Sequence, residues 1–159
     1  MGVLVDVSNM YHSAKNLYKK RVNFKEVLKE AVAGRKLIRA IAYVIKTENE
    51  EGTSFFEALS QQGFEVKMKD LQVFHGGAKK GDWDVGITVD AIKLAENLDV
   101  IILVTGDGDY LPLVNYLQNT KGCLVEVLAF RQTASSKLIE EADDFINLSE
   151  NKKFLITTR

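Results

Sequence analysis

The chain has 159 residues, a formal net charge of −1 at pH 7 and one cysteine. This length suffices for one domain with a sizeable core and no disulfides. The near-zero charge excludes a global basic field for nucleic acid, so such binding must come from local patches. The sequence also shows neither the ~20-residue apolar run of a membrane span nor a signal peptide. It therefore predicts a cytoplasmic protein with no membrane partner.

The first half of the chain alternates apolar strands with amphipathic helices. Residues 3–7 form an apolar run that contains Asp6, and Ser8 and Asn9 after it are common at helix starts. Helices are predicted over 10–18 and 24–32 and before Gly63, and strands over 37–45 and 64–69. The last strand alternates with period two, which puts Lys67 and Lys69 on one face.

The second half repeats the pattern. Residues 71–74 are expected to form an edge strand or a hairpin, and 75–82, rich in glycine, to be the least regular segment. Helices are predicted over 83–97, 110–118 and 134–142, and strands over 100–104, 123–128 and 145–148. We expect one domain over 1–150, followed by a tail, 151–159, that is either frayed or a weak extra strand.

This alternation predicts an α/β fold: a three-layer sandwich with a mostly parallel central sheet and helices on both faces. Helices in such folds run antiparallel to the strands. The start of the 83–97 helix, with Asp84, should therefore lie at the carboxyl edge of the sheet. Asp6 ends the first strand, and Asp107 and Asp109 follow the 100–104 strand. Ligands of open α/β sheets bind at this edge.

The turn that carries Asp107 and Asp109 has two interpretations. Both can be ordinary turn residues, with Asp109 as the cap of the next helix. Alternatively, two carboxylates on a turn shaped by Gly106 and Gly108 repel each other unless a cation or a proton lies between them. The second interpretation favours a metal site or a pair of acids with separated pKa values.

Four carboxylates at one sheet edge suit a hard divalent cation, Mg²⁺ or Mn²⁺, which prefers oxygen ligands. Such a site hydrolyses phosphodiesters by activating water and offsetting developing charge. We expect Asn9 to orient a metal-bound water or a phosphate oxygen. Thr105 is expected to hydrogen-bond either a phosphate or the second oxygen of an acid. The expected metal ligands and catalytic acids are Asp6, Asp84, Asp107 and Asp109.

Other acid-rich motifs fit the chain less well. Phosphatases of the haloacid-dehalogenase type carry a second Asp two residues after the first, where this chain has Ser8. The integrin-type metal motif Asp-x-Ser-x-Ser lacks its last ligand, because Met10 occupies that position. Neither a Rossmann glycine fingerprint nor a phosphate-loop lysine signature is present.

Several short motifs, in their order and spacing, resemble the NYN branch of the PIN-like nuclease superfamily, which includes LabA-like proteins. They are Asp6-x-x-Asn9, Lys80-Gly81 before Asp84-Val85, Asp90-Ala91, Thr105-Gly106-Asp107-Gly108-Asp109-Tyr110, Pro112-Leu113-Val114, and Ala142-Asp143 with Phe145. The resemblance implies a PIN-like fold, acidic residues that bind Mg²⁺ or Mn²⁺, and ribonuclease activity on single-stranded or structured RNA. Some members act as regulators, so the alternative is a non-catalytic RNA-binding or regulatory protein with a retained acidic pocket.

The chain departs from the family pattern in two places. The usual Ser-Gly-Asp-Ser-Asp-Phe appears as Thr-Gly-Asp-Gly-Asp-Tyr. The lysine before the central acid is offset by Asp82-Trp83, so either Lys79 or Lys80 can face the site.

The remaining candidates concern substrate contacts. Lys79 and Lys80, on a glycine-rich segment, are expected to hold the phosphate backbone, and Ser8 to contact substrate. Asp90 either supports the metal-binding acids from outside the site or is a buried acid paired with a neighbour. Trp83 either stacks on a base or anchors the loop. A homodimer is a further expectation.

Overall fold

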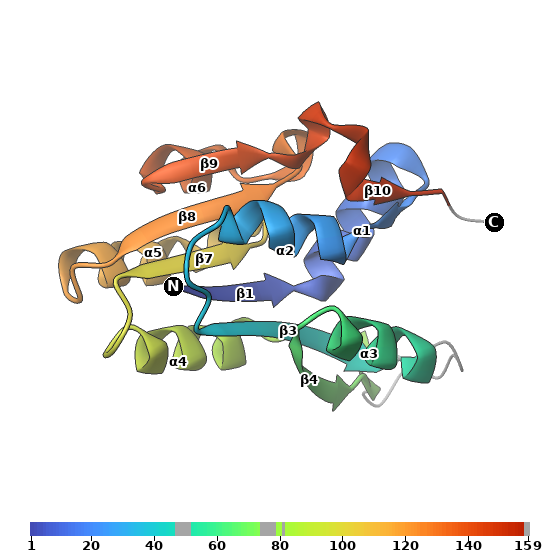
Figure 1. Ribbon diagram of the computed structural model, residues 1–159, viewed down its shortest axis with the longest axis horizontal. Helices are drawn as coiled ribbons and strands as arrows, with labels where there is room; N and C mark the ends of the chain where they lie inside the picture. Colours follow the sequence, from blue (N-terminus) through green and yellow to red (C-terminus); the bar gives the residue numbers. More distant parts are fainter. Residues whose placement is uncertain (47–51, 74–78, 81, 158–159) are drawn as a thin grey trace.

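The computed structural model describes residues 1–46, 52–73, 79–80 and 82–157. Its main sheet has six strands in the order β4-β3-β1-β7-β8-β9, and every neighbouring pair is parallel (Figure 1). They are β1 (Gly2–Asp6), β3 (Arg39–Lys46), β4 (Glu65–Asp70), β7 (Val100–Val104), β8 (Leu124–Ala129) and β9 (Asp144–Asn147). The predicted α/β fold with a parallel sheet is confirmed.

Helices cover both faces of this sheet. They are α1 (Val7–Tyr18), α2 (Phe24–Val32), α3 (Gly52–Gln61), α4 (Asp84–Leu94), α5 (Leu111–Asn119) and α6 (Ser136–Glu141). Side chains of successive β1 residues point to opposite faces: Val3 and Val5 pack with α1, α2 and α3, and Leu4 packs with α4, α5 and α6. Figure 1 shows α2 and α3 on the near face and α5 and α6 on the far face. No helix in the described ranges is long and apolar enough to cross a bilayer.

Helix boundaries differ from the prediction because other residues act as caps. Helix α1 begins at Val7, earlier than expected, since the Asp6 carboxylate accepts a hydrogen bond from the backbone N–H of Asn9 at 3.3 Å. Helix α6 begins at Ser136 because the Ser135 hydroxyl accepts from the N–H of Leu138 at 3.3 Å. Helix α4 ends at Leu94, three residues before the predicted end.

The expectation that Asp109 caps the helix after the acidic turn is wrong. The Asp107 carboxylate instead accepts a hydrogen bond from the backbone N–H of Asp109 at 2.9 Å. This bond opens the short 3₁₀ helix η1 (Gly108–Tyr110), and α5 follows with Pro112 in its first turn. Asp107 therefore caps the 3₁₀ turn, whereas α5 has Tyr110 at its N-cap position and no side-chain cap.

Two short antiparallel pairs complete the described chain. Strand β5 (Gln72–Val73) pairs with β6 (Lys79–Lys80), which confirms the hairpin alternative. Strand β6 belongs to the segment that was expected to be irregular, so that expectation is wrong for these two residues. Strand β10 (Leu155–Ile156) pairs with β2 (Arg21–Val22), so the extra-strand alternative for the tail is the observed one. The side chain of Phe154, just before β10, is buried in the core on the α1 and α2 side.

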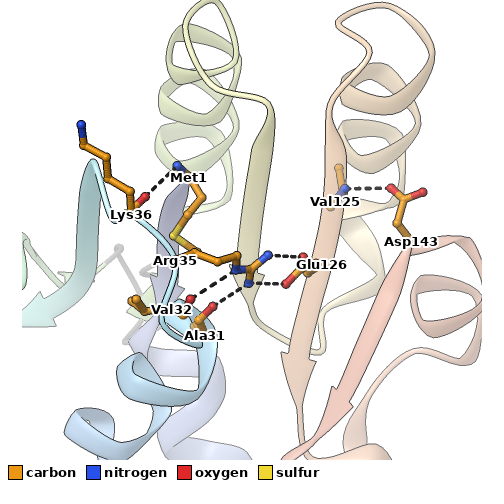
Figure 2. Close-up of polar contacts among 8 residues, drawn as sticks. All are labelled: Met1, Ala31, Val32, Arg35, Lys36, Val125, Glu126 and Asp143. Carbon is orange, nitrogen blue, oxygen red and sulfur yellow. Dashed lines mark hydrogen bonds and ion pairs between the residues drawn. The ribbon is translucent and has the colours of Figure 1, made fainter.

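Arg35 joins the end of α2 to strand β8 (Figure 2). Its guanidinium makes a two-pronged ion pair with Glu126 of β8, with N···O distances of 2.7 and 2.8 Å. The same group donates to the carbonyl oxygens of Ala31 and Val32 at the end of α2, at 2.8 and 3.2 Å. Arg35 therefore satisfies helix carbonyls that have no partner within the helix while it joins α2 to the sheet.

Replacing Arg35 by Ala should lower the free energy of unfolding by about 1–2 kcal/mol, measured by urea denaturation. The change leaves the Glu126 carboxylate, which is only 12% exposed, without its ion-pair partner. It also removes two hydrogen bonds to helix carbonyls. The matched control is Arg39→Ala, which breaks a similar pair with Glu65 whose side chains are 39% and 49% exposed. The control should cost about 0.5 kcal/mol or less. Equal losses from the two variants would contradict this account.

Candidate metal centre

Three aspartates from separate parts of the chain converge at the carboxyl edge of the sheet. Asp6 is the last residue of β1, Asp84 the first of α4, and Asp107 lies in the turn after β7. One carboxylate oxygen from each lies within 4.8 Å of the other two. Asp6 is 7% exposed, and the other two side chains are half-buried. The arrangement is an acidic pocket with one wall in the core.

The turn after β7 is fixed by hydrogen bonds and by a close approach of backbone. The Asn9 side-chain oxygen accepts from the N–H of Gly106 at 2.9 Å, and the Thr105 hydroxyl accepts from the N–H of Asp107 at 3.2 Å. A Cβ on Gly106 would lie 2.9 Å from the Cα of Ala134, which leaves no room for a side chain. Glycine is therefore required here by packing.

The buried hydroxyl of Tyr110 lies between two of the acids. It lies 3.0 Å from an oxygen of Asp84 and 3.3 Å from an oxygen of Asp6, and the ring is 1% exposed. The Thr105 hydroxyl donates to the same Asp6 oxygen at 3.3 Å. Tyr110 has one proton to donate, so it cannot serve both carboxylates fully at once.

These surroundings shift the protonation of the acids. Burial, and then the negative charge of Asp84, raise the pKa of Asp6 to about 6, although the hydrogen bond from the N–H of Asn9 lowers it. Burial also raises the pKa of Asp84; the hydrogen bond from Tyr110 opposes this shift and the charge of Asp107 adds to it. Burial and the two acids raise the pKa of Tyr110. The pocket thus favours a bound proton or cation.

The donor set fits a hard divalent cation. All three ligand atoms are carboxylate oxygens, the type that Mg²⁺ and Mn²⁺ prefer, and they approach one another despite their like charge. The three aspartates of this cluster could bind a metal ion.

The structure places the other predicted acid outside this cluster. The side chain of Asp109 is exposed, at the rim of the pocket, and its charge contributes to the raised pKa of Asp84 after the larger effect of burial. A role for Asp109 as a fourth ligand stays a prediction.

The predicted polar residues divide into two groups. Thr105 is 2% exposed and contacts Asp6, so the structure shows the acid-oxygen alternative. Asn9 uses its side-chain oxygen to hold the turn, and its orienting role stays a prediction. Ser8, half-buried in the first turn of α1, also remains a predicted substrate contact. Lys79 and Lys80 form β6, and their side chains lie outside the described part of the structure.

Asp90 belongs to a separate polar cluster on α4. Its carboxylate accepts from the Tyr43 hydroxyl at 2.8 Å and from the Lys67 ammonium at 2.7 Å. Burial raises the pKa of Asp90, but the hydrogen bonds from Lys67 and Tyr43 outweigh it and the pKa is lowered. Asp90 is thus an acid paired with its neighbours. Tyr43 is the register partner of Asp6 on β3, so an influence of Asp90 on the metal centre would pass through this ring.

Trp83 anchors the start of α4. Its indole N–H donates to the carbonyl of Val44 at 2.9 Å, and its ring lies 5.3 Å from that of Tyr43. A Cβ on Gly86 would lie 2.5 Å from the ring, so this glycine admits the indole. The loop-anchor alternative for Trp83 is the observed one. The anchor fixes the neighbouring residue, Asp84, relative to β3.

The contact that sequence reasoning missed is Tyr110. The exchange of the family's Phe for Tyr looks conservative, because both are aromatic. The structure shows that the added hydroxyl joins Asp6 to Asp84. The available signal was a phenol adjacent to a cluster of acids.

A parallel α/β sheet with acids gathered at its carboxyl edge fits the PIN-like, nuclease-type class, and the match to a family model places the chain there. The profile of the NYN domain matches residues 1–149, and the chain belongs to this family. It is 25% identical over 128 residues to the low amplitude and bright protein LabA of Synechococcus elongatus, covering 77% of this chain and 68% of LabA.

Two further proteins are similar to this chain. An uncharacterized protein of Methanocaldococcus jannaschii is 30% identical over 155 residues, covering 94% of this chain but only 55% of that protein. This chain therefore spans about half of that relative. The crystal structure of a Vibrio parahaemolyticus protein of unknown function matches with a TM-score of 0.89 and 35% identity, over 98% of this chain and 94% of that one.

The raised pKa of Asp6 gives a pH dependence of stability in chelator. Between its ordinary value of 3.8 and about 6, the folded state binds more protons than the unfolded state. Stability therefore falls as pH rises through this window, by about 3 kcal/mol at most. Asp6→Asn, which can still cap α1, should flatten this part of the curve and stabilise the metal-free protein at pH 8. Urea denaturation from pH 4 to 8 measures both, and parallel curves for the two proteins would contradict the assignment.

Tyr110→Phe tests the shared hydroxyl. In chelator at pH 8 it should lower the free energy of unfolding by about 1–2 kcal/mol, because the buried Asp6 and the half-buried Asp84 lose a shared donor. The same change in an Asp6→Asn background should cost less, since one of the charges is gone. Additive losses in this double-mutant cycle would show that the Tyr110 hydroxyl does not interact with the Asp6 carboxylate.

Proposed function

We propose that this NYN domain is a metal-dependent phosphodiesterase, and specifically an endoribonuclease that uses Mg²⁺ or Mn²⁺. The observation that carries the proposal is the approach of the Asp6, Asp84 and Asp107 oxygens to within 4.8 Å of one another. Membership of a nuclease-type family supports nucleic acid as the substrate class. Asp109, at the exposed rim, is proposed as a fourth acid.

The chain's own residues would hold the reacting groups in place. A bound divalent ion lowers the pKa of a water and offsets charge on the phosphate. Thr105 and Tyr110 fix the Asp6 carboxylate from the buried side, which leaves the half-buried Asp84 and Asp107 on the solvent side. No hydrogen bond to a described residue uses the Asn9 amide nitrogen, so this group can donate to a phosphate oxygen. Lys79 and Lys80 are proposed to hold the phosphate backbone.

Asp107→Asn is the direct test. It keeps the size of the side chain and removes a ligand charge, so cleavage of RNA should fall by about 100-fold or more. The assay incubates purified protein with single-stranded and structured RNA in Mn²⁺ or Mg²⁺, and calorimetry with Mn²⁺ should show weaker binding. The matched control is Asp99→Asn, which removes the same charge from an exposed acid before β7, at the opposite edge of the sheet. The control should cleave like wild type.

Two outcomes would overturn the proposed activity. Absence of cleavage by wild type, with retained metal and RNA binding, would favour the regulatory alternative. Cleavage of a chromogenic phosphomonoester in place of RNA would identify a phosphatase.

A further inference from the structure

A cleft of about 260 Å³ lies beside the exposed face of α1, away from the acids. It is lined by Tyr11, Lys15, Lys19, Lys20 and Arg21. Four of these five residues are cationic and none is acidic, although the chain as a whole has a net charge of −1. A basic concave surface on a near-neutral protein attracts a polyanion locally.

The fold gives this cleft a defined shape. Lys19 ends α1 in the left-handed conformation with φ of 56°, and its N–H donates to the carbonyl of Lys15 at 3.1 Å. The chain then turns into β2, where Arg21 pairs with Ile156 of β10 and the Val22 side chain is buried. The turn therefore presents three consecutive cations from a backbone held at both ends.

The aromatic side chain in the cleft points to the kind of polyanion. Tyr11 is 44% exposed, and its ring packs edge-on against His12 at 5.3 Å with an interplanar angle of 78°. The Lys15 ammonium lies 5.8 Å from the centre of the Tyr11 ring. An exposed ring beside cations is the combination with which proteins bind single-stranded nucleic acid: the ring stacks on a base while the cations contact phosphates. An acidic protein surface would need the cations but not the ring.

Helix α1 connects the cleft to the metal centre. Ser8, Tyr11 and Lys15 follow one another at spacings of three and four residues, so they lie on one face of the helix. Asp6 caps this helix, and Lys15 lies nine residues further, about 14 Å along the axis. A strand that follows this face covers a few nucleotides, the scale of a single-strand binding site.

We propose that this basic cleft binds the backbone of single-stranded RNA a few nucleotides from the metal centre, with Tyr11 stacking on a base. The inference rests on the proposed function for its substrate class. It assigns a binding role to residues that do not belong to the acidic pocket.

The test measures binding without cleavage. A fluorescein-labelled single-stranded RNA of about 12 nucleotides is titrated in EDTA, and its anisotropy is followed at several salt concentrations. Combined Lys15→Gln, Lys20→Gln and Arg21→Gln should weaken binding roughly tenfold or more at low salt. The slope of log K against log salt should fall by roughly 2, at about 0.7 for each lost phosphate contact.

The matched control changes three exposed lysines that lie outside the cleft. Lys29→Gln, Lys36→Gln and Lys93→Gln alter the net charge equally, and the affinity and salt slope should stay near wild type. A second pair tests the ring: Tyr11→Ala should weaken binding about tenfold, and Tyr11→Phe should not. Thermal melts of all variants verify folding.

Several results would overturn the inference. They are equal losses in the cleft and control variants, wild-type affinity in Tyr11→Ala, or displacement of the RNA by poly-glutamate of equal charge concentration. The last result would identify a general acid-binding surface. RNA binding through the cleft without cleavage in Mn²⁺ would leave the inference standing and refute the proposed ribonuclease. Cleavage of RNA by the wild type, together with unchanged RNA binding by the cleft variant, would refute the inference and leave the proposed ribonuclease standing.

Discussion

The proximity of three carboxylates, one buried and two half-buried, is the constraint on which this structure depends. Asp6 ends the central strand of the sheet, and Asp84 and Asp107 are brought against it by elements that also carry the core. At neutral pH, burial and mutual repulsion oppose this arrangement, as the raised pKa of Asp6 shows. Globular packing outweighs that cost. Proteins retain such local strain where the function requires it.

The polar contacts around the acids explain how the fold tolerates them. Each contact links the Asp6 carboxylate to a different element of the fold. Asn9 lies in α1, Thr105 directly follows β7, and Tyr110 lies in the 3₁₀ turn. On the outer side, Trp83 ties the start of α4 to β3, and Asp90 ties the middle of this helix to the same strand. The inner contacts set the orientation of the acids, and the outer ones set the position of the helix that brings Asp84.

The sequence was sufficient to predict features that follow from periodicity and topology. The unbroken apolar run of β7 identified the sheet centre. The antiparallel direction of helices and strands placed Asp84 at the same sheet edge as Asp6, although 78 residues separate them in the chain. Features that depend on exact local geometry were not predictable. Asp109 differs from Asp107 only in its place relative to a 3₁₀ turn, and that turn decides which acid faces the pocket. The pairing of β10 with β2 was also not predictable, because these two short strands are far apart in the sequence and no local pattern identifies them as partners.

The register of the sheet has a consequence for how the protein folds. Val3 of β1 pairs with Ile102 of β7, so the three aspartates are brought together by a contact between strands almost a hundred residues apart. Contacts of this range form slowly, because a long loop must be ordered first. The three aspartates therefore have no common location in the unfolded chain. Any ion they bind would stabilise only the native state, and the melting temperature would rise with the concentration of that ion.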